Sequence, residues 1–261
     1  MNKSKQTESS ECVVIGLGQL GQLYGGAALR LGMRVTPVTR HQSIADTCER
    51  VSKESPIVVA VGEGALNEVA REIPVHRRKD AVLVQNEIFM ESMNEIGLGE
   101  STLSTVWLSK KKQRPIEIAR VSCAYGPHAA WFRTLHQAID LPMQCAADAA
   151  QMEGELIAKY TFILTINVLG LVENITLGQW LEKDAALVES VAVDALGLAE
   201  AYAKTRVQAD QVLEIVREAM HGLAHYPARG RTAQQRLDKA IKDARQYQVD
   251  MPGISALKLS A

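Results

Sequence analysis

The sequence predicts an α/β protein: an N-terminal Rossmann domain with a doubly wound parallel sheet, followed by an all-helical C-terminal domain. Short β-branched runs alternate with short helical segments in the first half, which is typical of a parallel sheet. A G-x-G-x-x-G motif directly follows the first of these runs. Six of the eight prolines lie at or before Pro142 and none lies between Met143 and Tyr226, so the second half favours long helices.

The first half contains six segments with strand character. Residues 11–16 form a β-branched run that ends in glycine, as a buried parallel strand does. The other predicted strands are 34–39, 56–61, 80–85, 102–109 and 116–122. Helices are predicted over 20–31 and 64–73, and Pro37 indicates an edge strand. The basic turn at 110–114 is interpreted as a solvated hairpin loop between the last two strands.

The second half carries apolar residues at helical spacing. Four such segments are 156–170, 187–202, 212–219 and 237–247, and Pro252 is expected to stop the last one. The predicted organisation is a flexible tail at 1–11, an NADP-binding Rossmann domain at 12–145 and a helical domain at 146–261. The helical domain is expected to bind substrate. Long apolar helix faces often pack across a two-fold axis, so a homodimer is one hypothesis.

Composition excludes several classes of partner. With 29 Lys and Arg against 30 Asp and Glu, the formal net charge is −1, which argues against nucleic-acid binding. Four scattered cysteines make neither a disulfide framework nor a C-x-x-C metal site. No secretory signal is recognised, and the apolar run 160–172 is too short to span a bilayer. The chain is therefore expected to be cytoplasmic, with no membrane partner.

The glycine motif has the spacing of a dinucleotide site. It comprises Gly16, Leu17, Gly18, Gln19, Leu20 and Gly21. The first glycine makes a tight turn, the second lets the backbone approach a pyrophosphate, and the third lets helix and strand pack closely. The following helix would offer free N–H groups and a positive dipole end to phosphate. The alternative is a glycine-rich turn without a ligand.

Arg40 favours NADP over NAD as the cofactor. NAD-binding folds usually place an acid at the end of the second strand, where it holds the ribose 2′-hydroxyl. Here Arg40 stands at that point, with no acid before Asp46. A guanidinium suits a 2′-phosphate. The alternative is a surface arginine without a ligand.

A histidine pair and an arginine cluster are interpreted as surface features without a ligand. His221 and His225 are four residues apart, near Glu218, but the absence of a third ligand at a diagnostic spacing favours a surface pair over a metal site. No metal is therefore expected. Arg229, Arg231 and Arg236 are interpreted as a solvated helix start, with contact to a substrate carboxylate or a cofactor phosphate as the alternative.

The chain resembles the ketopantoate reductase family. The resemblance covers nearly the whole chain after the tail and rests on four places. These are 16–21 with Arg40 downstream, the strand end at 83–86, the Gly-Pro at 126–127, and the segment 155–159. It implies a Rossmann domain joined to a helical domain of the 6-phosphogluconate dehydrogenase type. It also implies NADPH as cofactor and a small-molecule substrate.

The resemblance implies roles for three residues. Lys159 would be the general acid that protonates the alkoxide formed when a ketone accepts hydride. Asn86 would position that lysine and touch cofactor and substrate, and Asn167 would bind substrate. Independently of the family, Lys159 is the only charged residue between Glu155 and Glu173 in an apolar segment. Such a lysine either serves a site or snorkels at a helix edge.

The chain also departs from the family pattern. Ile163 stands where the family has an asparagine one turn after the lysine, and Thr232 stands where it has a glutamate. A substrate-binding serine has no counterpart in 223–228, and the family's lysine after the third strand is replaced within 62–64. These positions bind the carboxylate and hydroxyls of ketopantoate in the family, so ketopantoate itself is not the expected substrate.

The sequence therefore predicts an NADP-dependent reductase of a small 2-oxo acid or related carbonyl compound. The departures motivate an alternative of another class, a catalytically impaired NADP-binding protein with a regulatory or redox-sensing role. A third interpretation is a dehydrogenase of an amino or opine-like acid with the same domain plan.

Overall fold

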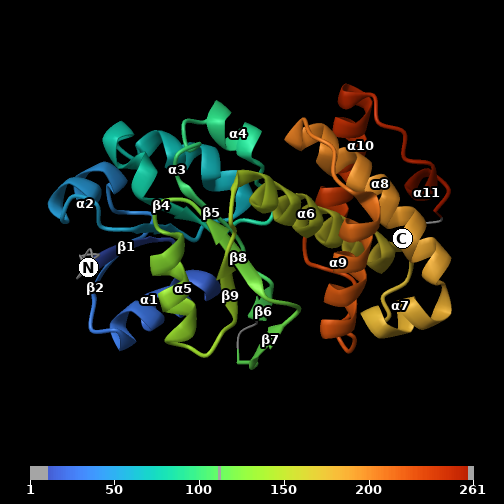
Figure 1. Cartoon of the computed structure of the whole chain (residues 1–261), viewed down its shortest axis with the longest axis horizontal. Helices are drawn as coiled ribbons and strands as arrows, with labels where there is room; N and C mark the ends of the chain where they lie inside the picture. The colour runs from blue at the N-terminus through green and yellow to red at the C-terminus, as the bar shows by residue number, and fades with distance from the viewer. Residues whose placement is uncertain (1–10, 111–112, 258–261) are drawn as a thin grey trace.

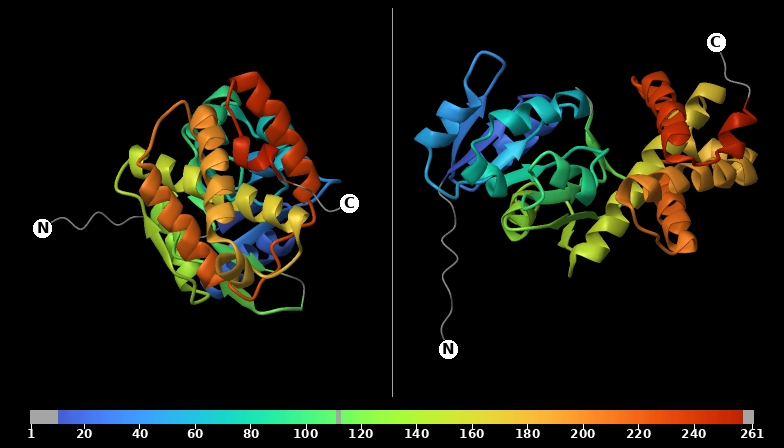
Figure 2. Two further views of the ribbon diagram at one scale, coloured as in Figure 1. Left: turned by 90° about the vertical axis from the view of Figure 1, so that its right-hand side faces the viewer. Right: turned by 90° about the horizontal axis from the view of Figure 1, so that it is seen from above.

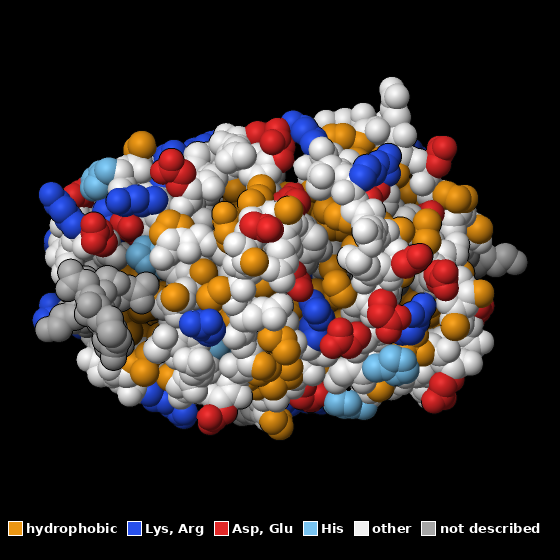
Figure 3. All heavy atoms as spheres, viewed as in Figure 1, with side chains coloured by type: hydrophobic (Ala, Val, Ile, Leu, Met, Phe, Trp, Pro, Cys, Tyr) orange, Lys and Arg blue, Asp and Glu red, His pale blue; other side chains and the backbone are white. Residues whose placement is uncertain are grey.

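The computed structural model describes residues 11–110 and 113–257. It shows a sheet-containing unit and a helical unit side by side along the long axis (Figures 1 and 2). The predicted tail at 1–11 lies outside the described residues except for Glu11, which is already the first residue of β1. Acidic and basic side chains are interspersed over the face shown in Figure 3.

The main sheet has seven strands in the order β2-β1-β3-β4-β5-β8-β9. Their bounds are β1 Glu11–Ile15, β2 Arg34–Val38, β3 Ile57–Val59, β4 Ala81–Leu83, β5 Thr102–Thr105, β8 Ser122–Tyr125 and β9 Met143–Cys145. All neighbouring pairs are parallel except β5 and β8. β2 is an edge strand, which explains why Pro37 is tolerated there. This arrangement confirms the predicted doubly wound sheet.

Helices cover both faces of this sheet (Figure 1). One face packs against α1 (Gln19–Arg30) and α5 (Ala129–Gln137), through side chains such as Tyr24 and Phe132. The other face packs against α2 (Ile44–Arg50), α3 (Leu66–Glu72) and α4 (Met90–Glu95). In β1, Cys12 and Val14 lie in the first core while Val13 and Ile15 lie in the second. Strands buried on both faces need this continuous apolar sequence.

The strands predicted at 102–109 and 116–122 are each interrupted. The chain leaves the main sheet after Thr105, forms a separate antiparallel hairpin from β6 (Leu108–Lys110) and β7 (Ile116–Ile118), and then re-enters as β8. The break places Trp107 in the core, where its backbone N–H donates to Ser122 Oγ at 3.0 Å. Two lysines of the basic turn, 111 and 112, lie outside the described residues.

The helical unit is built around one long central helix. Its helices are α6 Ala149–Val172, α7 Leu177–Lys183, α8 Ala185–Ala203, α9 Ala209–Gly222, α10 Ala233–Tyr247 and α11 Pro252–Ser255. α6 packs against α8, α9 and α10. Pro252 begins α11; the preceding helix ends earlier, at Gln248 in a left-handed conformation (φ 56°).

α6 joins the two units. Met152 and Leu156, in its first two turns, belong to the core beneath the sheet, and its later turns form the core of the helical unit. Within the described chain, α6 is the one helix long and apolar enough to cross a membrane, but 83% of that stretch is buried inside the protein. Its apolar character therefore reflects its central position in the core.

Candidate cofactor site and active site

The carboxyl ends of β1 and β3 meet at the point where the strand order reverses. The chain passes from β1 to β2 on one side and then returns to β3 on the other. Ligands of open α/β sheets bind in the crevice at such a point. The glycine loop at 16–21 follows β1 here, directly beside the end of β3.

Each glycine of the loop has the environment that its predicted role requires. Gly16 has a φ of +88°, and a Cβ there would lie 2.8 Å from the carbonyl oxygen of Ala60. A Cβ on Gly21 would overlap the carbonyl oxygen of Gly16, so α1 crosses the loop in direct backbone contact. A Cβ on Gly18 would meet nothing within 4 Å. Gly18 therefore leaves the surface open where a phosphate would approach.

The N-terminus of α1 is free of competing groups. Gly18 is its N-cap and offers no side-chain cap, and the first turn of the helix holds no acidic residue. Leu17 is exposed, and its carbonyl accepts a hydrogen bond from Gln22 Nε2 at 2.9 Å, which braces the loop. The backbone N–H groups of this turn are thus available to an anion. The residues present fit a dinucleotide pyrophosphate.

Arg40 lies in the exposed turn between β2 and α2. The turn is fixed by Gln42, whose Oε1 accepts from the backbone N–H of Thr39 at 2.8 Å and from its hydroxyl at 2.9 Å. Ser43 caps α2 through the N–H of Asp46. The guanidinium is therefore carried by an ordered turn next to the strand whose end normally faces the adenosine ribose.

Asn86 follows β4 and is tied to the end of β3. Its Nδ2 donates to Glu63 Oε1 at 3.2 Å, and the neighbouring Gln85 Nε2 donates to the carbonyl of Val59 at 2.8 Å. Glu63 begins a short 3-10 turn, Glu63–Ala65, after β3. These contacts hold the loops after β3 and β4 together at the edge of the sheet where the parallel strands have their carboxyl ends.

An ionic bridge links these loops to the helical unit. Arg236, from the first turn of α10, pairs with Glu63 Oε1 through Nη2 at 3.2 Å and with Glu87 through Nη1. Lys239 Nζ lies 3.6 Å from Glu87 Oε2. Burial alone would raise the pKa of Glu63, but the charge of Arg236, a hydrogen bond from the backbone of Glu63 itself and hydrogen bonds from Arg236 and Asn86 together hold that pKa below its usual value.

The bridge corrects one interpretation of the sequence. Arg236 is not part of a solvated helix start, since its side chain is only 14% exposed, whereas Arg229 and Arg231 are exposed. No local sequence pattern marks Glu63 or Glu87 as partners of Arg236. The one indication is that Glu63 lies in the segment 62–64, where this chain lacks the lysine that the family has.

Lys159 is buried on α6 and is 5% exposed. Its Nζ donates to the carbonyl of Val106 at 3.1 Å and lies 4.4 Å from the centre of the Trp107 ring, which is a cation–π distance. Burial, and secondarily the charges of Arg236 and Arg120, lower the pKa of Lys159 to about 7. The side chain therefore does not snorkel to solvent.

Trp107 also contacts a second pair of charged side chains, Glu155 and Arg120. Its Nε1 donates to Glu155 Oε2 at 3.3 Å, and the Arg120 guanidinium lies 5.2 Å from the ring centre. Arg120 Nη1 donates to the same Glu155 oxygen at 2.7 Å. Among the described residues no hydrogen bond joins Lys159 to Asn86. The structure thus places the predicted general acid and its predicted organiser in separate contact networks.

Asn167 is engaged with the backbone. Its Nδ2 donates to the carbonyl of Ile163 at 2.7 Å, and its Oδ1 accepts from the N–H of Gly230 at 3.2 Å. It thereby fixes the loop before α10 against α6. Ile163 lies partly buried, and together with Tyr160, Leu164 and Arg236 it lines a small hollow next to the ionic bridge.

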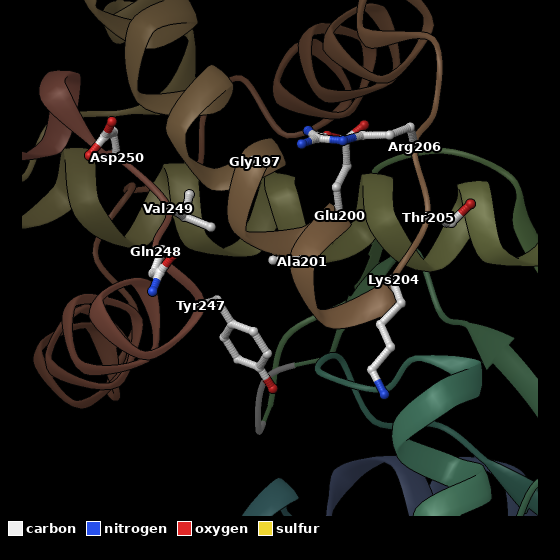
Figure 4. A pocket seen from close by; sticks show the side chains of 10 residues that line it. All are labelled: Gly197, Glu200, Ala201, Lys204, Thr205, Arg206, Tyr247, Gln248, Val249 and Asp250. Carbon is white, nitrogen blue, oxygen red and sulfur yellow. Dashed lines mark hydrogen bonds and ion pairs between the residues drawn. The ribbon is translucent and has the colours of Figure 1, made fainter.

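Two further hollows differ in their relation to this site. One, of 200 Å³, adjoins the ionic bridge, since it shares Glu87, Tyr160 and Lys239 with the small hollow, and it is also lined by the rings of Phe89 and Tyr202. The other, of 440 Å³, lies on the helical unit (Figure 4). Both of its cations are already paired: Glu200 turns toward Arg206, and Lys204 bonds Glu91 of α4. This second hollow therefore presents the exposed Asp250 carboxylate but no free cation to a ligand.

No metal-binding cluster occurs among residues 11–110 and 113–257. The two histidines considered in the sequence do not converge with Glu218. His225 pairs with Glu117, while Glu218 lies 3.5 Å from Arg120. All four cysteines are free thiols.

Comparison with known proteins identifies the fold. No family model and no curated sequence matches the chain. Among solved structures it is similar to a ketopantoate reductase from Ralstonia eutropha, with TM-score 0.65 and 16% identity, covering 94% of this chain and 95% of that one. It is also similar to a D-mandelate dehydrogenase solved with NADH and anilino(oxo)acetate, with TM-score 0.63 and 12% identity, covering 94% and 95%.

A third similar structure is a dimeric ketopantoate reductase from Staphylococcus aureus, with TM-score 0.61 and 16% identity over 94% of this chain and 95% of that one. The likeness extends through both units in all three cases. It confirms the fold that the resemblance in the sequence implied: a Rossmann domain followed by the helical domain of ketopantoate reductases. At these identities it shows the fold alone.

Proposed function

We propose that the chain is an NADP-dependent reductase of a small 2-oxo acid or related carbonyl compound. The observation that carries this proposal is the glycine loop, where Gly16, Gly18 and Gly21 fit a dinucleotide at the strand-order reversal. The neighbours that share the fold support it, since they include ketopantoate reductases and a dehydrogenase bound to NADH. Fold alone does not give function, so the assignment depends on the site.

The residues that would hold the cofactor come from three loops. The loop at 16–21 would receive the pyrophosphate on the N-terminus of α1, through Gly16, Leu17, Gly18, Gln19, Leu20 and Gly21. Arg40 would pair with the 2′-phosphate, which favours NADPH over NADH. Asn86 would face the nicotinamide end from the loop after β4. The bound NADPH would supply a hydride to the substrate carbonyl.

Lys159 would hold the proton that the reduced carbonyl oxygen takes up. A lysine whose pKa is about 7 is protonated and yet a competent donor at neutral pH, which is the condition for general acid catalysis. The Val106 carbonyl takes one of its three N–H donors, so the others remain for substrate. Asn167 stays a candidate substrate residue, and its present backbone bonds would have to rearrange for that role.

The proposal extends to the roles of the two domains, the oligomeric state and the location of the protein. We propose residues 12–145 as the NADP-binding domain and 146–261 as the helical domain for substrate binding and dimerisation. A dimeric neighbour supports the homodimer. Four free cysteines fit a reducing compartment, and the proposed location is therefore the cytoplasm. The proposal includes no nucleic-acid, membrane or metal partner.

The test measures NADPH oxidation with a panel of 2-oxo acids, for the natural protein and for Lys159→Ala and Lys159→Met. The methionine variant fills the lysine cavity, so that a loss of rate is not a packing defect. Turnover by the natural protein that drops by about 100-fold or more in both variants supports the proposal. Lack of turnover with every acid in the panel contradicts it.

One observation favours the alternative, a catalytically impaired NADP-binding protein with a regulatory or redox-sensing role. The Glu63–Arg236–Glu87 bridge ties the two units together, and Lys159 is buried against Val106 and Trp107. That alternative expects NADPH binding without turnover, and no change of the cofactor Kd in Lys159→Met. A fluorescence titration of NADPH, followed by the turnover assay with the substrate panel, separates the two.

A further inference from the structure

The Arg236 guanidinium is held between two carboxylates of the other unit. Arg236 projects from the first turn of α10, while Glu63 follows β3 and Glu87 follows β4. The ion pair to Glu63 measures 3.2 Å, and the pair to Glu87 uses the second Nη. Arginine is the side chain whose planar fork matches carboxylates, so protein carboxylates occupy the positions that a ligand carboxylate would take.

The third side of the guanidinium is fixed from its own helix. Arg236 Nε donates to Thr232 Oγ1 at 3.1 Å, one turn earlier. Thr232 is the residue that departs from the family's glutamate, and here it orients an arginine. The guanidinium therefore has a defined direction, toward the loops at the cofactor edge of the sheet.

Arg236 also lies close to the proposed reacting groups. It shares Glu63 Oε1 with Asn86, and it lines the same small hollow as Tyr160, the residue next to Lys159. Its charge is also one of the causes that lower the pKa of Lys159. A carboxylate bound at Arg236 would thus lie beside Asn86, the residue proposed to face the nicotinamide.

We infer that Arg236 binds the carboxylate of the substrate, and that Glu63 and Glu87 hold the guanidinium in place until that carboxylate replaces one of them. The inference rests on the proposed function and narrows its substrate class: 2-oxo acids are preferred over esters, amides and aldehydes of the same skeleton. Arg236 then determines specificity, separately from the chemical step at Lys159.

The exchange is feasible because each glutamate keeps a second partner. Glu63 retains the Asn86 Nδ2 donor at 3.2 Å, and Glu87 retains Lys239 at 3.6 Å. Neither carboxylate is left unpaired when the guanidinium turns to a ligand, which avoids the large penalty for an isolated buried charge.

The other cations near the cleft are less suited to this role. Lys159 is buried against Val106 and Trp107, and its proposed task is proton donation. Lys239 is half exposed and is shared between Glu87 and Asp243, the latter at 3.2 Å. Arg236 alone among these three combines burial, a fixed direction and a fork that takes a carboxylate by two bonds.

The first test measures binding of oxamate to the NADP-loaded protein by calorimetry. Oxamate carries the carboxylate and carbonyl of a 2-oxo acid but is not reduced, so binding is read without turnover. Arg236→Gln is expected to raise the oxamate Kd by about 30-fold or more. Arg236→Lys keeps the charge but loses the planar fork, so its oxamate Kd is expected to lie between those of the natural protein and Arg236→Gln. Arg245→Gln, an exposed arginine on the same helix, is the matched control and leaves the Kd unchanged.

The second test removes a competitor and keeps the arginine. Glu63→Gln preserves the size of the side chain and its hydrogen bonds but lowers its hold on the guanidinium. Oxamate is then expected to bind about twofold to fivefold more tightly. If the bridge served only to clamp the two units, the same variant would leave the Kd unchanged or raise it. This arm stays informative even if Arg236→Gln folds poorly.

The outcomes separate this inference from the proposed function. Oxamate binding that is equal in the natural protein and Arg236→Gln, or that is absent in the natural protein, overturns the inference, as does a Glu63→Gln variant without tighter binding. If the natural protein reduces 2-oxo acids while Arg236→Gln keeps its KM, the function stands and the carboxylate site is wrong. If the oxamate pattern holds but no 2-oxo acid is reduced, the reaction is wrong and the carboxylate site stands.

Discussion

Gly21 lies against the carbonyl oxygen of Gly16 so closely that a Cβ at position 21 would overlap that oxygen. The contact sets the angle between β1 and α1 and thereby the orientation of the helix N-terminus. Gly18, two residues after Gly16, has no neighbour within 4 Å of a built Cβ. One motif thus contains a glycine required for packing and a glycine that leaves space for a ligand.

This contrast leads to a paired prediction. Gly21→Ala is expected to destabilise the protein by about 2 kcal/mol or more, because backbone must move to admit the methyl group. Gly18→Ala is expected to leave the unfolding free energy nearly unchanged while weakening NADPH at least about tenfold, because the methyl group occupies the phosphate surface. Denaturant unfolding and NADPH titration of both variants check this. Equal NADPH affinity in Gly18→Ala and the natural protein would contradict the placement of the pyrophosphate.

Arg40 is predicted to select the 2′-phosphate. Arg40→Gln should weaken NADPH by about 10-fold to 100-fold, the range for a lost charge-assisted hydrogen bond, and leave NADH nearly unaffected. The ratio of the two dissociation constants, measured by fluorescence titration, is the readout. Arg30→Gln, at the exposed last turn of α1, is the control. A parallel loss of both cofactors in Arg40→Gln would indicate a disturbed turn and no role in selection.

The lowered pKa of Lys159 predicts a pH dependence of turnover. A general acid must be protonated, so the rate should be constant below about pH 7 and fall tenfold per pH unit above it. A kcat profile between pH 5.5 and 9.5 measures this limb (roughly 1.4 kcal/mol per tenfold change). A flat profile across that interval would exclude Lys159 as the proton donor.

The same pKa predicts a stability effect of a stated sign. The folded-state pKa of Lys159 is about 7 and lies below that of the unfolded chain, about 10.4, so the unfolded state binds more protons between these values. Stability should therefore rise with pH in that window, by at most about 1.4 kcal/mol per pH unit from this group. The contribution is read as the difference between the natural protein and Lys159→Met, which cancels groups common to both. If the two proteins change in parallel from pH 7 to 9.5, the lowered pKa is contradicted.

Removing one member of the Arg120–Glu155 pair is predicted to lower the free energy of unfolding much more than replacing both members. Both side chains are nearly buried, and their atoms lie 2.7 Å apart beside Trp107. Arg120→Met should destabilise by about 3 kcal/mol or more, since it leaves the Glu155 carboxylate buried, with Trp107 Nε1 as its remaining donor among the described residues. The double variant with Glu155→Gln should recover most of that loss. A double-mutant cycle of urea unfolding measures the coupling, and additive losses would show that the pair contributes little.

The sequence determined much of the Rossmann unit because its signals are local. The β-branched run before Gly16, the glycine spacing and Pro37 on the edge strand each depend on residues adjacent in the chain. The four helical segments followed from apolar periodicity in the same way. The break at Val106 and Trp107 was missed, since an apolar strand that leaves the sheet looks the same locally as one that stays in it.

The contacts of the candidate active site could not be predicted in this way. Glu63, Glu87 and Arg236 are separated by up to 173 residues and come together only because the side chain of Arg236, on the first turn of α10, reaches the loops after β3 and β4. Lys159 was singled out by its isolation in an apolar helix, but its partners Val106 and Trp107 come from the segment whose path was mispredicted.

The sequence by itself determined the fold class, the glycine loop and the residues that were candidates for chemistry, because periodicity and spacing act within a few turns of the chain. The tertiary structure decided which of those candidates are buried, charged or paired. Burial and electrostatic interaction depend on distances in space. They lower the pKa of Lys159 to about 7 and make Arg236 the ionic link between the two units.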